Sequence, residues 1–587
     1  LDASAPVDYT ANLNVPAGML LANIVADGGA SLTVTKLVAP GFNLLLLGGE
    51  IAINGQVSGK NVLINSTVAD SPVDDLEQSF IEDDLSEEEG DDISVGLYEA
   101  SASSKITIAS TASITAAQAI DILASLTLDK PFLPSGDWFN PLTFKLGEVK
   151  VDILGTLNAT GSLRANAVYA ATVEATSGML KVICPLAVGA VTGDTRLTVG
   201  GSARLTSGYG IRLGATSDIH VASEAMSGPM KFSIAVAVVE SDTHVLIGGN
   251  AHVQAAADAR ILARSTVHTE AAATGKMSDI LAVEPQSGIF LAGTFVDQST
   301  SAKITGAATV VSGAPTTLGS ESKVFTQTTA VSIPAAESTM NFSMFSILPF
   351  VEKLLKVEKA PNQSMFGKIV SKATGSNSLG NKFTDGTSSA QPDTGSVTQV
   401  MGAAAVAYVS NENAALIDTT GGVTSAGALD VNARAVTVSE LRADGSLYKT
   451  PPIVPEIPGT TPEPEPNNAV GVGIAVGITN HENSAKILHG AISARDLNVE
   501  ANTRRITSSI MSKSGHIPKD ADFGLGGAVT VHVLICRNDS LIAGAPTYTL
   551  PAGGRVSAIS AGAGCFTTVA DASGKRVTPG LSFGGYE

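Results

Sequence analysis

Apolar and polar residues alternate in short runs along most of this chain. The stretch SIAVAVVESDTHVLIGG, residues 233–249, has a small-apolar alternating run, a polar break, and a second run that ends in a hydrophobic pair and glycine. Further alternating runs follow such phrases, as in ALDVNARAVTVSELRA after Ile417. Alternation over four to eight residues, stopped by Gly, Asn or Asp, is typical of β-strands. The pattern therefore predicts an all-β protein.

The same phrase recurs at intervals along the chain. GAAAVAYVSNENAALIDTTGG begins at Gly402, GIAVGITNHENSAKILHG at Gly473 and GGAVTVHVLICRNDSLIAG at Gly526, and weaker copies begin at Ser94 and Leu291. An alignment on the isoleucine of the second run places these residues at one position: Ile247, Ile304, Ile417, Ile487 and Ile542. The spacings are 57, 113, 70 and 55 residues. They predict a repeat unit of about 56 residues, counted twice in the second spacing and lengthened by an insertion in the third.

Many short strands at regular spacing must close into barrels, pair as sandwiches or stack as a solenoid. The repeated unit shows no Greek-key change of spacing, which favours the solenoid. The apolar positions carry Ala, Val, Ile and Leu, which suit a thin interior, and the polar faces carry Thr, Ser and Asn, which can form ladders between turns. We expect turns of about 20–25 residues, and hence two to three turns in each unit.

The phrase also resembles the β-strand repeats of large secreted filamentous adhesins, the haemagglutinin-like and leukotoxin-like bacterial surface proteins. The resemblance covers about residues 94–125 and 230–570, with insertions. It implies a right-handed parallel β-helix and export to the cell surface. No catalytic motif of that family is present to transfer.

Insertions divide the predicted solenoid. The solenoid segments are residues 1–69, 93–342, 397–450 and 469–587. Between them lie an acidic loop at 70–92, a helical and loop insert at 343–396 and a proline-rich insert at 451–468. Solenoid insertions lie on the outside, where longer loops cost little closure entropy, so we expect binding functions there.

The acidic loop is the candidate metal site. Residues 70–92 hold twelve acidic residues and no basic one, and carboxylate oxygens are the ligands that Ca²⁺ prefers. The spacing fits neither an EF-hand nor a calcium-binding roll, and a solvated loop is the alternative. The candidate ligands are Asp83, Asp84, Glu87, Glu88, Asp91 and Asp92.

Two other segments are candidate contact surfaces. Residues 129–144 hold the single tryptophan, and Trp138 and Phe139 are candidates for stacking on a glycan. Alternatively, these aromatic residues and Phe144 pack on the solenoid wall. Residues 343–359 have the spacing of an amphipathic helix with interleaved lysines. That helix either covers a sheet face or binds a membrane surface or partner.

Composition and charge exclude several functions. The net charge is −19, and no basic field exists for binding nucleic acid. No apolar run is long enough for a membrane-spanning helix, which needs about 18 residues. The scattered Cys184, Cys536 and Cys565 match no disulfide framework or zinc spacing; a Cys536–Cys565 pair and buried free thiols both remain open. His481 lacks a second histidine at zinc-binding spacing and is expected on the surface.

These observations favour a structural or adhesive extracellular rod without catalysis and without a cofactor, with Ca²⁺ as a candidate ion. The chain begins at Leu1, so we expect a processed or partial polypeptide that continues into further chain or self-assembles, with a surface receptor or glycan as partner. One alternative is a polysaccharide lyase or glycoside hydrolase on a β-helix, which would show charges at matching positions of neighbouring turns. We expect Thr, Ser and Ala on the strand faces instead. A phage or viral fibre is a further alternative.

Overall fold

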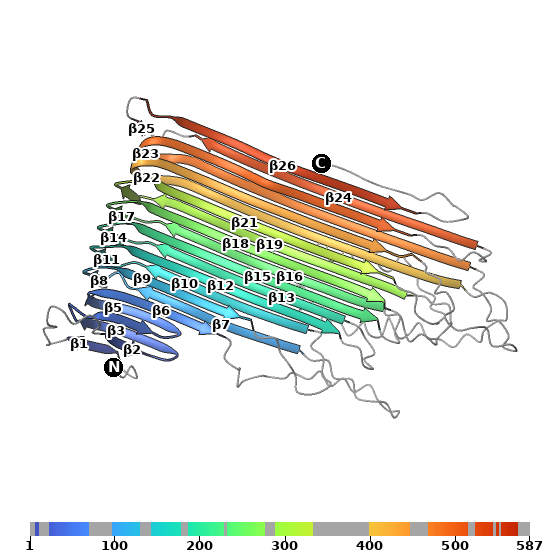
Figure 1. Cartoon of the computed structure of the whole chain (residues 1–587), viewed down its shortest axis with the longest axis horizontal. Coiled ribbons are helices and arrows are strands. Elements are labelled where there is room, and N and C mark those ends of the chain that lie inside the picture. Colours follow the sequence, from blue (N-terminus) through green and yellow to red (C-terminus); the bar gives the residue numbers. More distant parts are fainter. Residues whose placement is uncertain are drawn as a thin grey trace.

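The chain folds as a parallel β-solenoid, which confirms the predicted fold (Figure 1). The computed structural model describes residues 6–10, 23–69, 97–129, 142–177, 186–227, 232–275, 288–332, 398–446, 468–514, 523–543, 547–550 and 553–572. In these ranges the strands form one continuous hydrogen-bonded system in which each turn pairs with the next in parallel. Parallel stacking gives most backbone groups a partner in the turn above or below.

Most turns consist of a long strand, a strand of three or four residues and a second long strand. The first such turn contains β7 (Leu97–Ile108), β8 (Ser113–Ala116) and β9 (Ile120–Leu128). The next turns contain β10 (Leu142–Ile153), β11 (Thr156–Ala159) and β12 (Leu163–Ser177); β13 (Leu186–Val199), β14 (Arg204–Ser207) and β15 (Ile211–Ser227); β16 (Phe232–Ile247), β17 (His252–Ala255) and β18 (Ala259–Gly275); and β19 (Gly288–Gly306), β20 (Thr309–Ser312) and β21 (Thr316–Val331). β22 (Thr398–Asp444) and β23 (Asn468–Lys513) each run through a whole turn, and β24 (Phe523–Ile542), β25 (Thr547–Thr549) and β26 (Val556–Asp571) form the last. We call these the wide turns.

The aligned isoleucines lie directly above one another. Ile247 pairs with Ile304, Ile304 with Ile417, Ile417 with Ile487, and Ile487 with Ile542. The column continues in the other direction through Val199 and Ile153. Each spacing is therefore a single turn, including the spacing of 113 residues, where a long insertion was mistaken for a second unit. The prediction of two to three turns per unit is wrong for the wide turns.

The N-terminal strands form narrower turns. They are β1 (Val7–Thr10), β2 (Asn23–Asp27), β3 (Ser31–Val38), β4 (Asn43–Leu47), β5 (Glu50–Gly59) and β6 (Asn61–Ala69). Ser31 pairs with Glu50 and Asn43 with Asn61, so one turn takes 19 or 18 residues, just below the predicted 20–25. β5 pairs with only the last four residues of β7 and then with β8, so the solenoid widens at this step. We call these the narrow turns.

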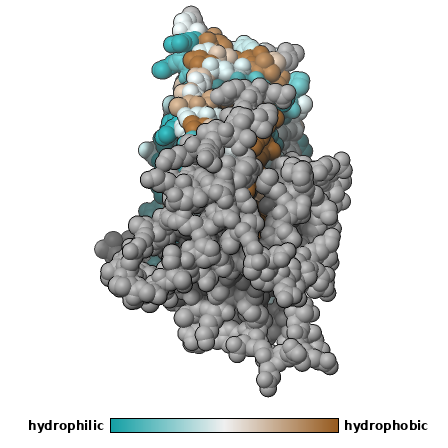
Figure 2. Space-filling view, turned by 90° about the vertical axis from the view of Figure 1, so that its right-hand side faces the viewer, coloured by the Kyte–Doolittle hydropathy of each residue, from teal (hydrophilic) through white to brown (hydrophobic). Residues whose placement is uncertain are grey.

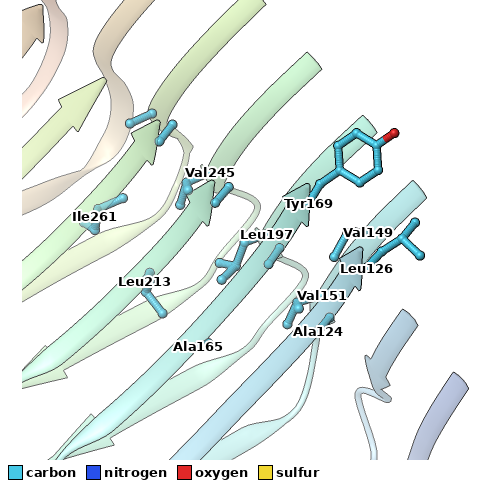
Figure 3. Close-up of a cluster of buried hydrophobic side chains, with 14 of the residues drawn as sticks. Ala124, Leu126, Val149, Val151, Ala165, Tyr169, Leu197, Leu213, Val245 and Ile261 are labelled. Atoms are coloured by element: carbon cyan, nitrogen blue, oxygen red, sulfur yellow. The ribbon is translucent and has the colours of Figure 1, made fainter. Parts of the chain in front are cut away.

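The core lies between two facing parallel sheets of the wide turns. The first sheet contains β7, β10, β13, β16, β19 and β24, and the second contains β9, β12, β15, β18, β21 and β26; β22 and β23 contribute to both. Every second residue points inward, as the alternating burial along β9 and β18 shows. In Figure 3, Val149, Leu197 and Val245 come from the first sheet and Leu126 and Leu213 from the second.

Glycines make room for the largest buried side chain. Tyr169 is fully buried on the second sheet (Figure 3), and a Cβ added at Gly147 or Gly193 of the first sheet would overlap its ring. Gly147 and Gly193 pair with each other in successive turns. Small residues thus let the sheets approach closely, in agreement with the thin interior that the Ala, Val, Ile and Leu positions predicted.

The gaps between the described ranges mostly fall at one place in the turn. Every gap from the one at residues 130–141 to the one at residues 515–522 lies between the second long strand of one wide turn and the first long strand of the next. The predicted helix at 343–359 and the proline-rich insert lie in two of these gaps, outside the described residues. Within the described ranges, no helix is long and apolar enough to cross a membrane.

Candidate functional site

The candidate site residues from the sequence lie outside the described residues. This holds for the Ca²⁺ candidates Asp83, Asp84, Glu87, Glu88, Asp91 and Asp92, and for the glycan candidates Trp138 and Phe139. The part of the chain that the structure describes contains no group of three or more His, Cys, Asp or Glu placed to hold a metal ion. Phe144, from the same aromatic segment, is described and packs on the solenoid wall, on the outer face of the first sheet.

That outer face carries an apolar stripe across successive turns. Phe144, Ala190, Val238 and Phe295 pair in register and form a hydrophobic cluster separate from the core. Their side chains point away from the interior, yet Phe295 is only 4% exposed and Phe144 8%. Partly buried residues of the same face pack against this cluster. They are Leu142, Val188 and Val236, each two residues before a cluster member on its own strand, and Val406 and Tyr408 of β22. We call this set the outer apolar stripe.

Beside the stripe runs an outer charged ladder. Glu148, Asp194 and Asp242 pair in register, and each is followed by a basic residue two positions later on the same strand. Lys150 Nζ lies 2.7 Å from Glu148 Oε1, Arg196 Nε 2.6 Å from Asp194 Oδ1, and His244 Nε2 3.8 Å from Asp242 Oδ1.

The environments of these three carboxyl groups differ. The hydrogen bond from Lys150 lowers the pKa of Glu148, and the nearby imidazole of His244 lowers the pKa of Asp242. The pKa of Asp194 is raised, mainly by burial, against the lowering effect of Arg196. The expectation of Thr, Ser and Ala on the strand faces is therefore wrong for this face. The strands do show acidic residues at matching positions, but the signal emerges only when the turns are aligned in their true register.

Glu240 and Asp297 lie between the stripe and the ladder. They are register partners in adjacent turns. Burial raises the pKa of Glu240, and the negative charges of Asp297 and Asp242 raise it further. A carboxyl group whose proton is held more tightly than usual is suited to proton donation, and a neighbouring carboxylate is the usual second group of glycosidic chemistry.

Inside the solenoid runs a column of polar residues that the sequence analysis did not predict. One inward position carries a polar residue in six successive turns: Thr195, Thr243, Thr300, Asn413, Asn483 and Asn538. The inward position next to it carries Ser241, Gln298, Asn411 and His481, and Cys536 is in register with them in the last described turn, where it is exposed. We call these two rows the interior polar column. The sequence analysis expected Thr, Ser and Asn ladders on the outer faces; this column instead lies inside.

The asparagines of the column form a hydrogen-bonded ladder along the axis. Asn413 Nδ2 donates to Asn483 Oδ1 at 2.8 Å, and Asn483 Nδ2 donates to Asn538 Oδ1 at 2.8 Å. Asn538 Nδ2 then donates to the carbonyl oxygen of Ala561 at 2.6 Å. These bonds link three turns and stabilise their register, because buried amides are costly unless paired.

His481 lies in the column and not on the surface, so that expectation is wrong. The residue is fully buried, with Nδ1 3.0 Å from Thr437 Oγ1 and Nε2 3.1 Å from Thr503 Oγ1. Burial lowers its pKa to about 4, so the imidazole is neutral at neutral pH. Its two ring contacts are to hydroxyl groups, which gives it a structural and not an acid–base environment.

The cysteines and the concave surfaces add little. Cys536 and Cys565 are free thiols and exposed, so both the disulfide between them and their burial are wrong, and Cys184 lies outside the described residues. A shallow depression of about 670 Å³ lies at the step between narrow and wide turns, lined by Asp27, Glu50, Asn65 and Ser103 among others.

No protein-family model, curated protein or solved structure matches this chain.

Proposed function

We propose that this chain is a structural or adhesive solenoid segment of an extracellular or cell-surface protein. The observation that carries the proposal is the parallel ladder that runs through all described turns on one axis, with a core continuous from the narrow turns to β23. In such a stack each turn is stabilised by its nearest neighbours, so length and stiffness are gained by adding turns. The resemblance to filamentous adhesins supports the same reading.

The last described turn supports assembly at that end. Along β24 and β26, Ile535, Val556 and Ile559 are 42%, 49% and 47% exposed. Brown apolar side chains lie among teal polar ones over these C-terminal strands at the top of Figure 2. A sheet edge of this kind is a template for further pairing. The narrow turns are too short to cover two long strands, so the matching partner is another wide turn, from a second copy or from the same polypeptide.

Sedimentation velocity across a range of concentrations tests the assembly. We expect association that weakens in the Ile535→Lys variant, because a charge on an edge strand opposes pairing. Leu63→Lys is the matched control, since Leu63 is 39% exposed in a narrow turn. A monomer at all concentrations, or equal loss of association in both variants, would contradict assembly through the last turn.

A second candidate is an enzyme that cleaves polysaccharide. The outer charged ladder and the Glu240–Asp297 pair favour it, since charges at matching positions of neighbouring turns are what such an enzyme requires. Incubation with a panel of acidic and neutral polysaccharides, read by new reducing or unsaturated ends, tests it. Activity that Glu240→Gln abolishes and that Glu174→Gln, on β12 of the second sheet, spares would replace the structural proposal. The fibre of a phage or virus would share the fold and the assembly test.

A further inference from the structure

The interior polar column contains polar atoms that the protein itself leaves without partners. Both Gln298 side-chain atoms, Nε2 and Oε1, lack a hydrogen bond among the described residues, and Gln298 is fully buried. The same holds for Thr300 Oγ1, Ser320 Oγ and Asn413 Oδ1, whose residues are 1%, 3% and 2% exposed. Buried polar side-chain atoms in native proteins usually have a partner, either protein or ordered water.

These atoms lie together in two adjacent turns. Gln298 and Thr300 are on β19, and Thr300 pairs in register with Asn413 of β22. Ser320 comes from the facing sheet, on β21, and Asn413 Nδ2 reaches its carbonyl oxygen at 3.4 Å. The orphan donors and acceptors therefore converge from both sheets on one part of the interior.

The neighbouring turn shows what a satisfied column is like. Asn483 Nδ2 bonds to Asn538, and Asn483 Oδ1 accepts from Asn413, so the side chain has partners at both ends. Asn411 is likewise held by Ser322 and Thr437. Gln298 stands in the same row as Asn411, one turn away, but has no such contact.

We propose that the interior between β19, β21 and β22 binds ordered water. Gln298 Nε2 would donate to one water molecule and Gln298 Oε1 would accept from another, while the hydroxyls of Thr300 and Ser320 and Asn413 Oδ1 would complete the shells of these waters. Water can donate and accept, as this mixed set requires, and a buried water typically makes about three hydrogen bonds. These side chains are all neutral, and burying a cation without a counter-charge is costly, so the set fits water better than a metal ion.

The wild-type full chain gives the direct test. A crystal structure at a resolution that shows solvent is expected to hold at least one water at about 2.7–3.2 Å from the Gln298 amide and from a second member of the set. Oxygen-17 relaxation dispersion of the same protein in solution is expected to show long-lived internal water. An interior without solvent density and without long-lived water would overturn the proposal.

The sign of a stability change gives an independent test. Gln298→Met keeps the side-chain volume and removes two ligands of the water. If the site is hydrated, the melting temperature falls by about 2–4 °C, since the water loses its anchor while Thr300 and Asn413 still need it. If the site is dry, the same change removes two unpaired polar atoms and raises the melting temperature, which would overturn the proposal. Gln327→Met makes the same change at an exposed position of β21 and is the control.

A third measurement separates water from a monovalent ion. The melting temperature is compared in potassium, sodium and choline chloride at equal ionic strength. We expect no difference between the three salts for the wild-type chain. A rise specific to potassium or sodium that Gln298→Met abolishes would assign the site to that cation and overturn the water proposal.

Discussion

The narrow and wide turns fill their interiors differently. In the narrow turns the buried residues are mostly large and apolar, such as Leu32, Leu44, Leu46, Ile51 and Ile64. Among the described residues of the narrow turns, the one deeply buried hydroxyl belongs to Ser66, which lies at the step and bonds to Ser104 of β7. In the wide turns, aliphatic residues such as Ile304 lie near the short strands, the interior polar column occupies the middle of the long strands, and further apolar residues such as Val296 and Phe290 lie beyond it.

The difference shows how width determines the contents of a solenoid. Four leucines and a valine fill the 19-residue turn that begins at Ser31: Leu32, Val34, Leu37, Leu44 and Leu46. A wide turn needs two flat sheets at a close distance over many residues, so small side chains are required. Serine, threonine and asparagine are small enough, and they are tolerated because they bond to one another between sheets and between turns.

The largest expected effect comes from replacing a buried leucine of a narrow turn with asparagine, a residue that the wide turns bury. Leu46→Asn would put an amide between its register partners Ala26 and Ile64, which offer no side-chain partner. Loss of the apolar side chain and burial of an unpaired amide together should destabilise the narrow turns by roughly 5 kcal/mol. Chemical denaturation followed by circular dichroism measures this. Leu45→Asn, on the outward side of the same strand, should have a much smaller effect, and equal effects would refute the distinction.

The reverse exchange should also be destabilising. Asn483→Leu leaves the amides of Asn413 and Asn538 without their shared partner, which should cost about 3–4 kcal/mol. Asn498→Leu is the control, because Asn498 bonds to Asp430 on the partly exposed face of the same strand. If Asn483→Leu proved neutral or stabilising in denaturant unfolding, the amide ladder would not contribute to the register of these turns.

Acid should weaken the wide turns through His481. Its folded pKa of about 4 lies below the ordinary 6.5, so the unfolded chain binds more protons between these two values. Stability from this group is complete above pH 6.5 and is lost as the pH falls towards 4, by up to about 3 kcal/mol.

Melting temperatures between pH 4 and 7 measure this loss. The decline should be shallower in His481→Asn, which copies Asn411 of the preceding turn. Identical pH profiles for the wild type and His481→Asn would show that His481 does not titrate in this way.

The smallest effect concerns the close approach of the sheets. Gly147→Ala should destabilise the chain by about 1–3 kcal/mol, because the added methyl group overlaps the Tyr169 ring. Tyr169→Leu in the same chain should recover part of the loss, since Leu126 occupies that position one turn away. Gly527→Ala, where nothing lies within 4 Å of the added carbon, is the control. Urea midpoints that are equal for Gly147→Ala and Gly527→Ala would contradict the packing argument.

The sequence predicted the fold better than the interior. Period-two alternation and the aligned isoleucines identified parallel stacking and the true register of Ile247, Ile304, Ile417, Ile487 and Ile542. Turn length was wrong for the wide turns because their long strands, such as the 19 residues of β19, were taken for several short ones. The spacing of 113 residues was counted as two units because an insertion of unknown size cannot be told from a second unit by spacing alone.

The interior polar column was missed for a different reason. Alternation separates two faces of a strand without saying which is inside, and a polar row looks exposed until its partners in the next turn are known. His481 and Asn483 acquire their hydrogen bonds from residues far away in sequence, such as Thr437 for His481 and Asn413 for Asn483. The charged ladder of Glu148, Asp194 and Asp242 was hidden in the same way.

The position of the gaps between wide turns has a practical consequence. The stretch from Ser227 to Phe232 and the much longer one from Val331 to Thr398 join equivalent strands, and the ladders on either side keep their pairing. Connections at this rim can therefore change in length independently of the stacked sheets. The rim is a natural grafting position, where a foreign peptide or a whole folded module could be spliced between turns and displayed at a spacing fixed by the scaffold beneath it.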